Sequence, residues 1–337
     1  MGSRNRLKPI IDLLVIARAR KGVKMNGIRS QMLWICFTMI SMILVSCTPA
    51  QKLESTKIDQ SPRLVIMSAF EPELIQLRLQ TKITNTYVIN GRTYHVGELA
   101  GNDVVLVLSG ISMVNAAMTA QSVLDHFDVS GVVFSGIAGG VNPNLAIGDV
   151  VVPAQWGEYQ EQTFARETTS GWQASSDFGN YGMMFPQSIS LTQNDRKPDS
   201  EEQLFWLPVS QDMLDVAKDA ADEVGLSDCT QTNVCLEHDP KVVVGGKGVS
   251  GPTFVDNASY REWVWQTFQA DAPDMESAAV AHVAYVNNVP FIAFRSLSDL
   301  AGGGPGENES STFFQLAADN STNVVIAFLE KYPGSGE

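Results

Sequence analysis

The chain has 337 residues, of which 44% are hydrophobic and 18% charged, a composition typical of a globular protein rather than a disordered one. Its net charge is −14, and residues 1–46 hold eight basic residues but only one acidic residue, so 15 basic and 36 acidic residues elsewhere give that part a charge of −21. A domain with this excess of negative charge repels the phosphates of nucleic acids, which argues against nucleic-acid binding. Four cysteines are too few for a cysteine-rich metal or disulfide scaffold.

The N-terminal segment has the pattern of an export signal. The apolar run Met32–Val45 follows several basic residues and is short for a membrane span but suits the core of a signal peptide. It ends at Ser46-Cys47, and a small residue before a cysteine resembles the bacterial lipobox, in which Cys47 becomes the first mature residue and carries the acyl chains. The alternative is an ordinary signal peptide or membrane anchor with an incidental cysteine.

These features predict the domain boundaries and the location. Residues 1–46 are expected to be the signal segment, with Met25 as an alternative start that gives a signal of ordinary length. Residues 47–61 form a tether, and residues 62–332 form one domain. We therefore expect an exported, periplasmic bacterial lipoprotein held by its acyl chains, most simply at the outer membrane.

Two cysteines of the body, Cys229 and Cys235, enclose a short loop. In an oxidising compartment a disulfide between them persists, and closing the loop contributes about 2 kcal/mol. A zinc site would need two more ligands, and only His238 is close in sequence. The pattern therefore favours a disulfide.

The first half of the body alternates short apolar strands with helical segments. Asn90-Gly91 lies between two alternating runs and is a strong hairpin signal. The expected elements are strand 63–69, helix 71–80, hairpin strands 86–89 and 93–99, strand 104–108, helix 113–127, strand 132–135 and a strand at 150–153.

Residues 156–208 differ from this pattern, because they are polar, rich in turns and spotted with aromatic residues. We interpret them as an insertion over one face, a candidate lid or partner surface.

Regular alternation resumes after the insertion. The expected elements are helix 211–224, strand 241–244, a helix at 257–268 capped by Asp256 or Asn257, helix 276–286, strand 290–294 and helix 311–331. Apolar strands alternating with helices predict an α/β fold, a three-layer α/β/α sandwich around a mixed central sheet.

Acidic residues and hydroxyls follow four of the predicted strands, where α/β folds bind their ligands. The four segments are 68–73, 109–115, 273–278 and 295–299. They contain no histidine or cysteine, which favours carboxylate acid–base chemistry over a catalytic triad or a metal site. Taken singly, Glu73, Glu276 and Asp299 could be ordinary helix-start or loop-capping residues, and Gly139 could serve only close packing.

Four motifs in order resemble the purine nucleoside phosphorylase and nucleosidase superfamily. They are VFSGIAGG with IGDVVVP, KGVSGPTFVDNASYREW, DMESAAVAHVAY and FRSLSDLAGG. The resemblance runs from about Pro62 to Tyr332. It is strongest to methylthioadenosine/S-adenosylhomocysteine nucleosidases and to plant bark storage proteins, and the latter share the loop from Cys229 to Cys235.

The resemblance implies a role for each matching residue. Glu73 would orient or deprotonate the attacking water, with Arg295 and Ser109 nearby, and Asp299, positioned by Ser298, would protonate the purine. The remaining residues would bind substrate: Met275 and Glu276 the ribose, Phe254 the face of the base and Val255 its edge. We expect Ser109 to contact the ligand as well. Physically, an oxocarbenium-like transition state needs an acid at the leaving base and a nucleophile under C1′.

Hydrolysis is the expected reaction, because phosphorolysis needs cationic groups for phosphate and neither 70–74 nor 109–115 contains one. A purine nucleoside phosphorylase is one alternative, and a non-catalytic binding or storage protein is the other. The substrate is expected to resemble methylthioadenosine or S-adenosylhomocysteine, or to be adenosine or inosine. The resemblance further implies a homo-oligomer and no metal or organic cofactor.

Overall fold

The structure is a computed structural model that describes residues 57–191 and 202–332, all within one unit of the chain, 55–337. The predicted signal segment, the alternative start at Met25, the lipidation site Cys47 and most of the tether lie outside the described residues. Among the residues described, no helix is long and apolar enough to cross a membrane.

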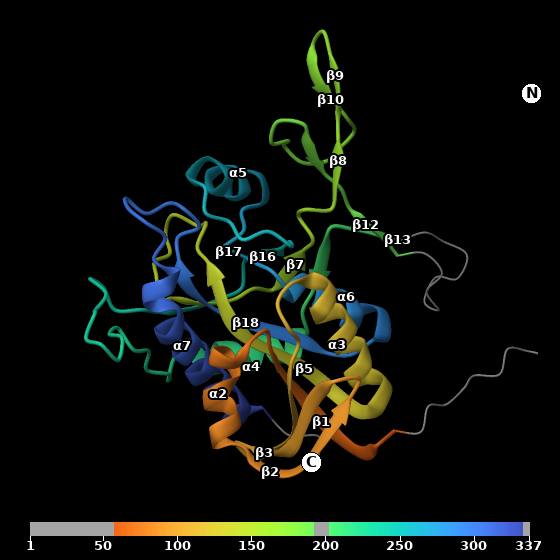
Figure 1. Cartoon of the computed structure of the whole chain (residues 1–337), viewed down its shortest axis with the longest axis vertical. Helices are drawn as coiled ribbons and strands as arrows, with labels where there is room; N and C mark the ends of the chain where they lie inside the picture. The colour runs from red at the N-terminus through yellow and green to blue at the C-terminus, as the bar shows by residue number, and fades with distance from the viewer. Residues whose placement is uncertain (1–56, 192–201, 333–337) are drawn as a thin grey trace, which may run out of the picture. The chain divides into compact units, whose positions relative to one another are not determined.

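An eight-stranded mixed sheet forms the centre of the domain (Figure 1). The pairs of β1 with β4 and β5, of β5 with β18 and of β6 with β15 are parallel, whereas those of β3 with β2 and β4 and of β18 with β6 are antiparallel. In spatial order the strands are β15 (Val242–Val244), β6 (Val150–Val152), β18 (Phe291–Asp299), β5 (Phe127–Gly139), β1 (Asp59–Ser68), β4 (Asn102–Leu108), β3 (Arg92–Leu99) and β2 (Lys82–Ile89).

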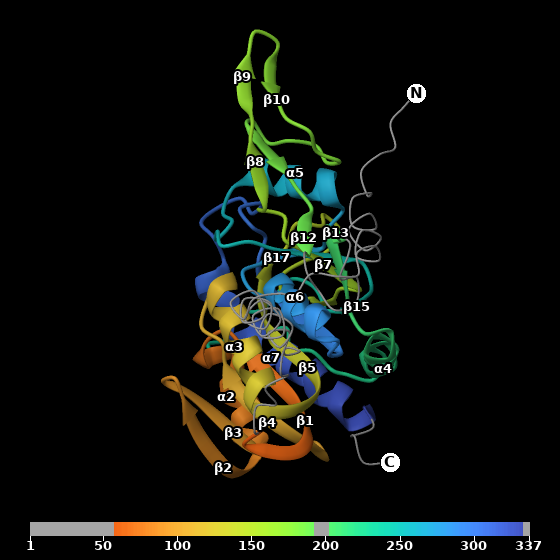
Figure 2. The ribbon, with the colours of Figure 1, turned by 90° about the vertical axis from the view of Figure 1, so that its right-hand side faces the viewer.

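Helices cover both faces of this sheet, as Figures 1 and 2 show. Alternate residues of β1 point to opposite faces, so that Val65 and Met67 join one core and Leu64 and Ile66 the other. The first core includes α3 (Met113–His126) and α6 (Ser277–Asn287), and the second includes α2 (Glu71–Gln80), α4 (Gln211–Ala221) and α7 (Ser310–Lys331). The expected three-layer sandwich is confirmed.

The turn between β2 and β3 has the geometry expected of Asn-Gly. Asn90 has a φ of 50° and Gly91 a φ of 78°, the pair of positive values that a tight hairpin turn requires. The expected hairpin therefore forms, with Ile89 opposite Arg92.

Two central strands are longer than the sequence pattern predicts. β5 continues to Gly139 and β18 to Asp299, through serines that the pattern assigns to strand ends. These buried hydroxyls find partners: Ser135 Oγ lies 2.9 Å from Ser321 Oγ, and Ser321 donates to the carbonyl of Phe294 at 3.1 Å. Helix α7 thus satisfies the hydroxyl of Ser135, and the carbonyl of Gly148 accepts from that of Ser296 in β18 at 3.3 Å, so both strands can continue.

The segment 156–208 begins and ends inside the fold. Trp156 of β7 is fully buried, and β7 pairs with β14, so both ends of the segment join a second sheet. This sheet has the order β14 (Trp206–Pro208), β7 (Gln155–Gly157), β16 (Lys247–Ser250) and β17 (Ala272–Asp274). Several aromatic residues of the segment 156–208 are part of the protein interior, since Tyr159 and Phe205 share a core with Phe268 of α5 (Ala258–Phe268).

Between β7 and β14 the chain forms three small antiparallel ribbons, and two of them extend from the body as an arm (Figures 1 and 2). The ribbons are β8 (Gln162–Phe164) with β11 (Met184–Pro186), β9 (Arg166–Thr168) with β10 (Gly171–Gln173), and β12 (Ile189–Leu191) with β13 (Glu202–Leu204).

Two local expectations are settled by the structure. Cys229 and Cys235 form a disulfide. Of the two candidate caps of α5, Asn257 is the one used, because its side chain accepts from the backbone nitrogen of Tyr260 at 2.9 Å.

Candidate active site

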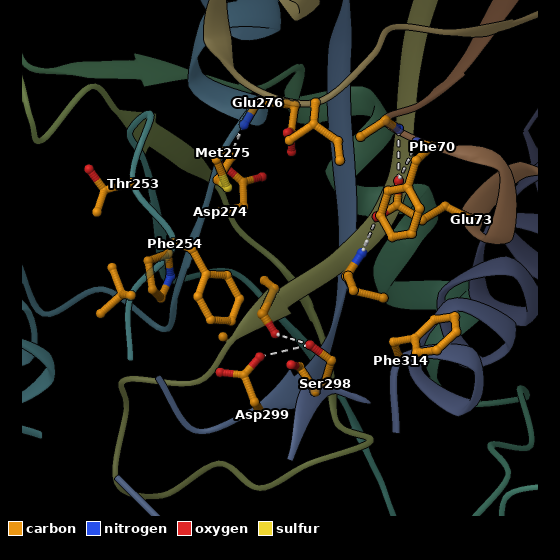
Figure 3. Close-up of a pocket in the computed structure, with 18 of the residues that line it drawn as sticks. Phe70, Glu73, Thr253, Phe254, Asp274, Met275, Glu276, Ser298, Asp299 and Phe314 are labelled. Atoms are coloured by element: carbon orange, nitrogen blue, oxygen red, sulfur yellow. Dashed lines mark hydrogen bonds between the residues drawn. The ribbon is translucent and has the colours of Figure 1, made fainter. Parts of the chain in front are cut away.

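One cavity of about 330 Å³ lies where the carboxyl ends of β1, β5, β17 and β18 meet (Figure 3). Parallel strands bring residues that are far apart in sequence to one edge of the sheet. The cavity is lined by Ala69, Phe70, Glu73, Ile111, Ile137, Ala138, Gly139, Thr253, Phe254, Val255, Pro273, Asp274, Met275, Glu276, Ser298, Asp299, Ser310, Ser311 and Phe314.

Glu73 lies in the first turn of α2, with 2% of its surface exposed. Its Oε2 accepts from the backbone nitrogens of Ala69, at 2.7 Å, and Phe70, and its Oε1 accepts from that of Ile137 at 2.9 Å. Burial raises the pKa of Glu73, although these donors and the guanidinium of Arg295 oppose the shift. The carboxylate is therefore fixed in direction and more basic than a solvated one.

Arg295 lies behind the carboxylates and is fully buried. Its Nε is 2.8 Å from Asp274 Oδ2, its Nη2 is 3.4 Å from Glu276 Oε2, and its Nη1 is 3.7 Å from Glu73 Oε1. The guanidinium stacks 4.4 Å from the centre of the Phe134 ring. Arg295, expected among the catalytic residues, does not line the cavity, and its polar contacts, behind the lining, are with the three acidic side chains, with Ser277 and with the carbonyl of Ile137.

The backbone beside this cluster has to be glycine. A Cβ atom on Gly136 of β5 would overlap both the Glu73 carboxylate and the guanidinium of Arg295. The GIAGG sequence thus lets two charged side chains cross directly over the strand.

Glu276 precedes α6, and its Oε1 accepts from the backbone nitrogen of Ser112 at 2.8 Å. Burial raises its pKa to about 7, helped by the neighbouring Asp274 and Glu73 charges and opposed by Arg295. Asp274 accepts from the backbone nitrogens of Glu276 and Ser277, both at 3.2 Å, and from the hydroxyl of Ser250. Asp274 thereby fixes the turn that presents Glu276 to the cavity.

Asp299 ends β18 and is 2% exposed. Its Oδ2 accepts from the hydroxyl of Ser298 at 2.9 Å, and its Oδ1 accepts from the backbone nitrogen of Ala301 at 2.8 Å. Burial raises the pKa of Asp299, with these donors opposing. A carboxyl group in such surroundings retains a proton more readily than a solvated one, as a general acid must.

The residues expected to contact a base are gathered beside Asp299. Phe254 and Val255 line the cavity, as does Met275, which is expected at the ribose, and in the view of Figure 3 the Phe254 ring lies between Met275 and Asp299. Phe254 is 58% exposed, so its ring is free to cover a ligand.

Ser109 takes a different position from the rest. Its side chain is buried and donates to the carbonyl of Gly110 at 2.8 Å, and it is not among the lining residues. Its neighbour Ile111 lines the cavity instead. Gly139, which the sequence left open, does line it.

Several lining residues are not singled out by the sequence pattern, notably Phe70, Asp274, Ser310, Ser311 and Phe314. Phe70 and Asp274 lie within the strand-end segments 68–73 and 273–278, so their positions in the sequence could have identified them as site residues. Phe314 is one apolar residue among many on α7, and only the packing of that helix brings it to the cavity.

The lining contains four carboxylates and neither lysine nor arginine. Arg92 approaches one edge, but its guanidinium donates to the carbonyl of Ser109 and to Asn115 Oδ1. Over residues 57–191 and 202–332, no group of three or more His, Cys, Asp or Glu is arranged to hold a metal ion.

Comparison with known proteins places this geometry in a family. Residues 63–330 match the model of the phosphorylase superfamily. The chain is 30% identical over 273 residues to a 5′-methylthioadenosine/S-adenosylhomocysteine nucleosidase of Tolumonas auensis, covering 80% of this chain and 99% of that protein. It is also 30% identical over 257 residues to bark storage protein A of Populus deltoides, covering 73% and 79%.

A solved structure is similar over most of its length. It is the nucleosidase of the same specificity from Colwellia psychrerythraea in complex with adenine, with a TM-score of 0.60, 27% identity and coverage of 81% of this chain and 96% of that one.

The chain belongs to the phosphorylase superfamily, as the motifs indicated. Its nucleosidase relatives match over nearly their full length, which confirms the expected class of enzyme, an N-glycosidase acting on nucleosides.

Proposed function

We propose that this protein hydrolyses the N-glycosidic bond of a purine nucleoside, releasing the free base and the sugar. One arrangement carries the proposal: a single cavity holds a base-stacking ring and an acid at one side and a buried, basic carboxylate at the other. Figure 3 shows Phe254 and Asp299 at the left and Phe70 and Glu73 at the right, with Met275 above Phe254 and Glu276 at the top of the view.

This arrangement suits the charge changes of glycosidic cleavage. Asp299 gives its proton to the purine ring, the electron pair of the C1′–N bond passes to the leaving base, and positive charge develops on the ribose. Water adds to C1′ from the other side and loses its proton to Glu73. Glu276 accepts hydrogen bonds from the ribose hydroxyls, and its negative charge stabilises the cationic sugar.

The lining favours water over phosphate as nucleophile. A phosphate dianion beside four carboxylates, with no cation among the lining residues, would be repelled, whereas water would not. Phosphorolysis therefore remains only an alternative outcome of the test below.

The apolar lining residues Phe70, Ile111 and Phe314 favour a substrate with an apolar 5′ substituent, such as the thioether of methylthioadenosine or S-adenosylhomocysteine. Ser310 and Ser311 also reach the cavity, and they would instead suit the 5′-hydroxyl of adenosine or inosine. Comparing kcat/KM across these four nucleosides distinguishes the two.

The test of the reaction uses the chain from Thr48 onward with each nucleoside, with and without phosphate, in water enriched in ¹⁸O. We expect free base without phosphate and one ¹⁸O atom in the sugar. Base released only with phosphate would show a phosphorylase. No base from any nucleoside, by protein shown to be folded, would favour a binding or storage protein, an alternative that the similarity to bark storage protein A supports.

We also propose that the chain is exported and anchored through lipid on Cys47, since a basic segment, an apolar run and Ser46-Cys47 follow one another. Incorporation of labelled palmitate, abolished by Cys47→Ser, is the expected result. Unchanged labelling in that variant would contradict it.

A homo-oligomer is a further proposal. Val114 and Met118 of α3 are 73% and 54% exposed, an unusual exposure for apolar side chains close to the Ile111 edge of the cavity. Light scattering after gel filtration would measure the mass of the assembly.

A further inference from the structure

Asn308 connects three parts of the chain at the base side of the cavity. Its Nδ2 donates to Asp299 Oδ1 at 3.3 Å and to Asp256 Oδ1 at 3.1 Å, and its Oδ1 accepts from the backbone nitrogen of Ser310 at 2.9 Å. The last contact fixes which way the amide faces, because only the oxygen can accept from a backbone N–H. Both amide hydrogens therefore face carboxylates.

The two oxygens of Asp299 consequently have different partners. Oδ1 accepts from two N–H groups, those of Ala301 and Asn308, and neither can accept a hydrogen bond in return. Oδ2 accepts only from the hydroxyl of Ser298, and that hydroxyl also lies 3.4 Å from the carbonyl of Ala138. Rotation of the Ser298 hydroxyl toward Ala138 frees Oδ2, whereas the N–H groups cannot turn away from Oδ1.

We propose that Asn308 is a positioning residue that keeps Asp299 Oδ1 an acceptor and so makes Oδ2 the oxygen that carries the transferable proton. The inference rests on the proposed function, in which Asp299 is the acid. After the proton has passed to the base, Asn308 also stabilises the carboxylate that remains. It therefore orients the acid before proton transfer and stabilises its conjugate base afterwards.

Other charged groups near Asp299 cannot replace this contact. Glu309, next along the chain from Asn308, is acidic and opposes ionisation of Asp299, and Asp256, which accepts the other hydrogen bond of the Asn308 amide, is acidic as well. Across the cavity the charged lining groups are Glu73, Asp274 and Glu276, also acidic. The cation beside this loop is Arg261 of α5, whose Nε donates to the carbonyl of Gly140.

The first test is a measurement of the Asp299 carboxyl itself. In protein labelled with ¹³C at aspartate carboxyls, the Asp299 signal is assigned by its loss in Asp299→Asn and followed against pH. We expect the Asp299 pKa to rise by about half a unit to one unit in Asn308→Ala, as loss of a hydrogen bond to a charged group predicts. Asn308→Asp should raise it further, because it removes the donors and adds a negative charge.

The control is Asn287→Ala, which also removes an amide that donates two hydrogen bonds, to Gln121 Oε1 and the carbonyl of Val283, but at the end of α6 opposite to the one that carries Glu276. It should leave the Asp299 pKa unchanged. An unchanged Asp299 pKa in Asn308→Ala, with its melting temperature showing a folded protein, would overturn the proposal. If that variant does not fold, the same comparison is made with Asn308→Asp, which keeps an acceptor for Ser310.

The second readout is turnover. At neutral pH kcat should fall about threefold to tenfold in Asn308→Ala, and the alkaline limb of its pH profile should move upward with the Asp299 pKa. A fall in kcat with the alkaline limb unmoved would indicate a merely structural residue. The carboxyl titration needs no turnover. If the wild type released no base, the proposed function would be refuted, but the titration would still test the effect of Asn308 on Asp299.

Discussion

Arg295 Nε lies 2.8 Å from Asp274 Oδ2, and both side chains are almost completely buried. Asp274 itself accepts from the backbone nitrogens at the start of α6. The guanidinium of Arg295, which does not line the cavity, thus holds Asp274 and through it the turn that carries Glu276.

Replacing Arg295 tests this dependence. Arg295→Met would leave Glu73, Asp274 and Glu276 buried without their cation, and removal of one partner from a buried ion pair costs about 3–5 kcal/mol. We expect that loss in urea unfolding at pH 8 and a smaller one at pH 5, where the orphaned carboxyls take up protons. Lys218→Met, which breaks an exposed pair with Asp215, is the control and should change little. Equal stability of Arg295→Met and the wild type at pH 8 would contradict this account.

Asp299→Asn removes the proposed acid and keeps the shape of the side chain. We expect kcat to fall about 10²- to 10⁴-fold, with adenine binding retained, because general acid catalysis contributes about that much. Titration calorimetry with adenine and a base-release assay measure the two effects. Asp319→Asn, at another carboxyl whose pKa is raised by burial, is the matched control and should remain active. Full activity in Asp299→Asn would remove it from the mechanism.

Glu276 makes substrate binding depend on pH. Its pKa is raised from 4.5 to about 7, so the carboxylate that we propose accepts from the ribose hydroxyls forms as the pH rises through about 7. KM should therefore fall roughly tenfold in total between pH 6 and pH 8, most of it below pH 7. In Glu276→Gln this dependence should disappear, and a profile that persists there would assign it to another group.

The raised pKa of Glu276 favours substrate binding at high pH but stabilises the folded protein at low pH. The folded protein binds the Glu276 proton more tightly than the unfolded chain, so its contribution is fully present below pH 4.5 and is lost as the pH rises to about 7. Urea unfolding of the wild type and Glu276→Gln across this range should show a smaller decline in the variant.

Phe254→Ala tests the proposed stacking on the base. We expect KM to rise about tenfold, equivalent to 1.4 kcal/mol, with kcat nearly unchanged, because a stacked ring binds ground state and transition state alike. Trp172 of β10 is an exposed aromatic residue outside the cavity lining, and Trp172→Ala should leave KM unaltered. A large fall in kcat instead would mean that the ring orients the base for protonation.

The disulfide should contribute to stability and not to catalysis. Replacing Cys229 and Cys235 by serine should lower the free energy of unfolding by about 2 kcal/mol through loop entropy. Neither residue lines the cavity, so kcat and KM should stay the same. Loss of activity in a folded double variant would show that the loop supports the site.

Much of the fold could be predicted because its signals are local. The continuous apolar run of β1, the Asn90-Gly91 turn and the helix boundaries follow from neighbours within a few residues. Ser135 of β5 and Ser296 of β18 misled the same reasoning, because their partners, Ser321 and the carbonyl of Gly148, are remote in sequence. The polar sequence that follows Trp156 likewise suggested that an insertion begins there, although Trp156 packs over Gly248 in the second sheet.

For the site, the sequence by itself determined the strand ends and the acidic residues that follow them, including Glu73, Glu276 and Asp299. Only the tertiary structure decided that Arg295 lies behind the carboxylates, that Ser109 turns away from the cavity and that Asn308 holds one oxygen of Asp299. The reason is physical: a periodic pattern records which face of an element is buried, whereas a contact between side chains depends on how separate elements pack.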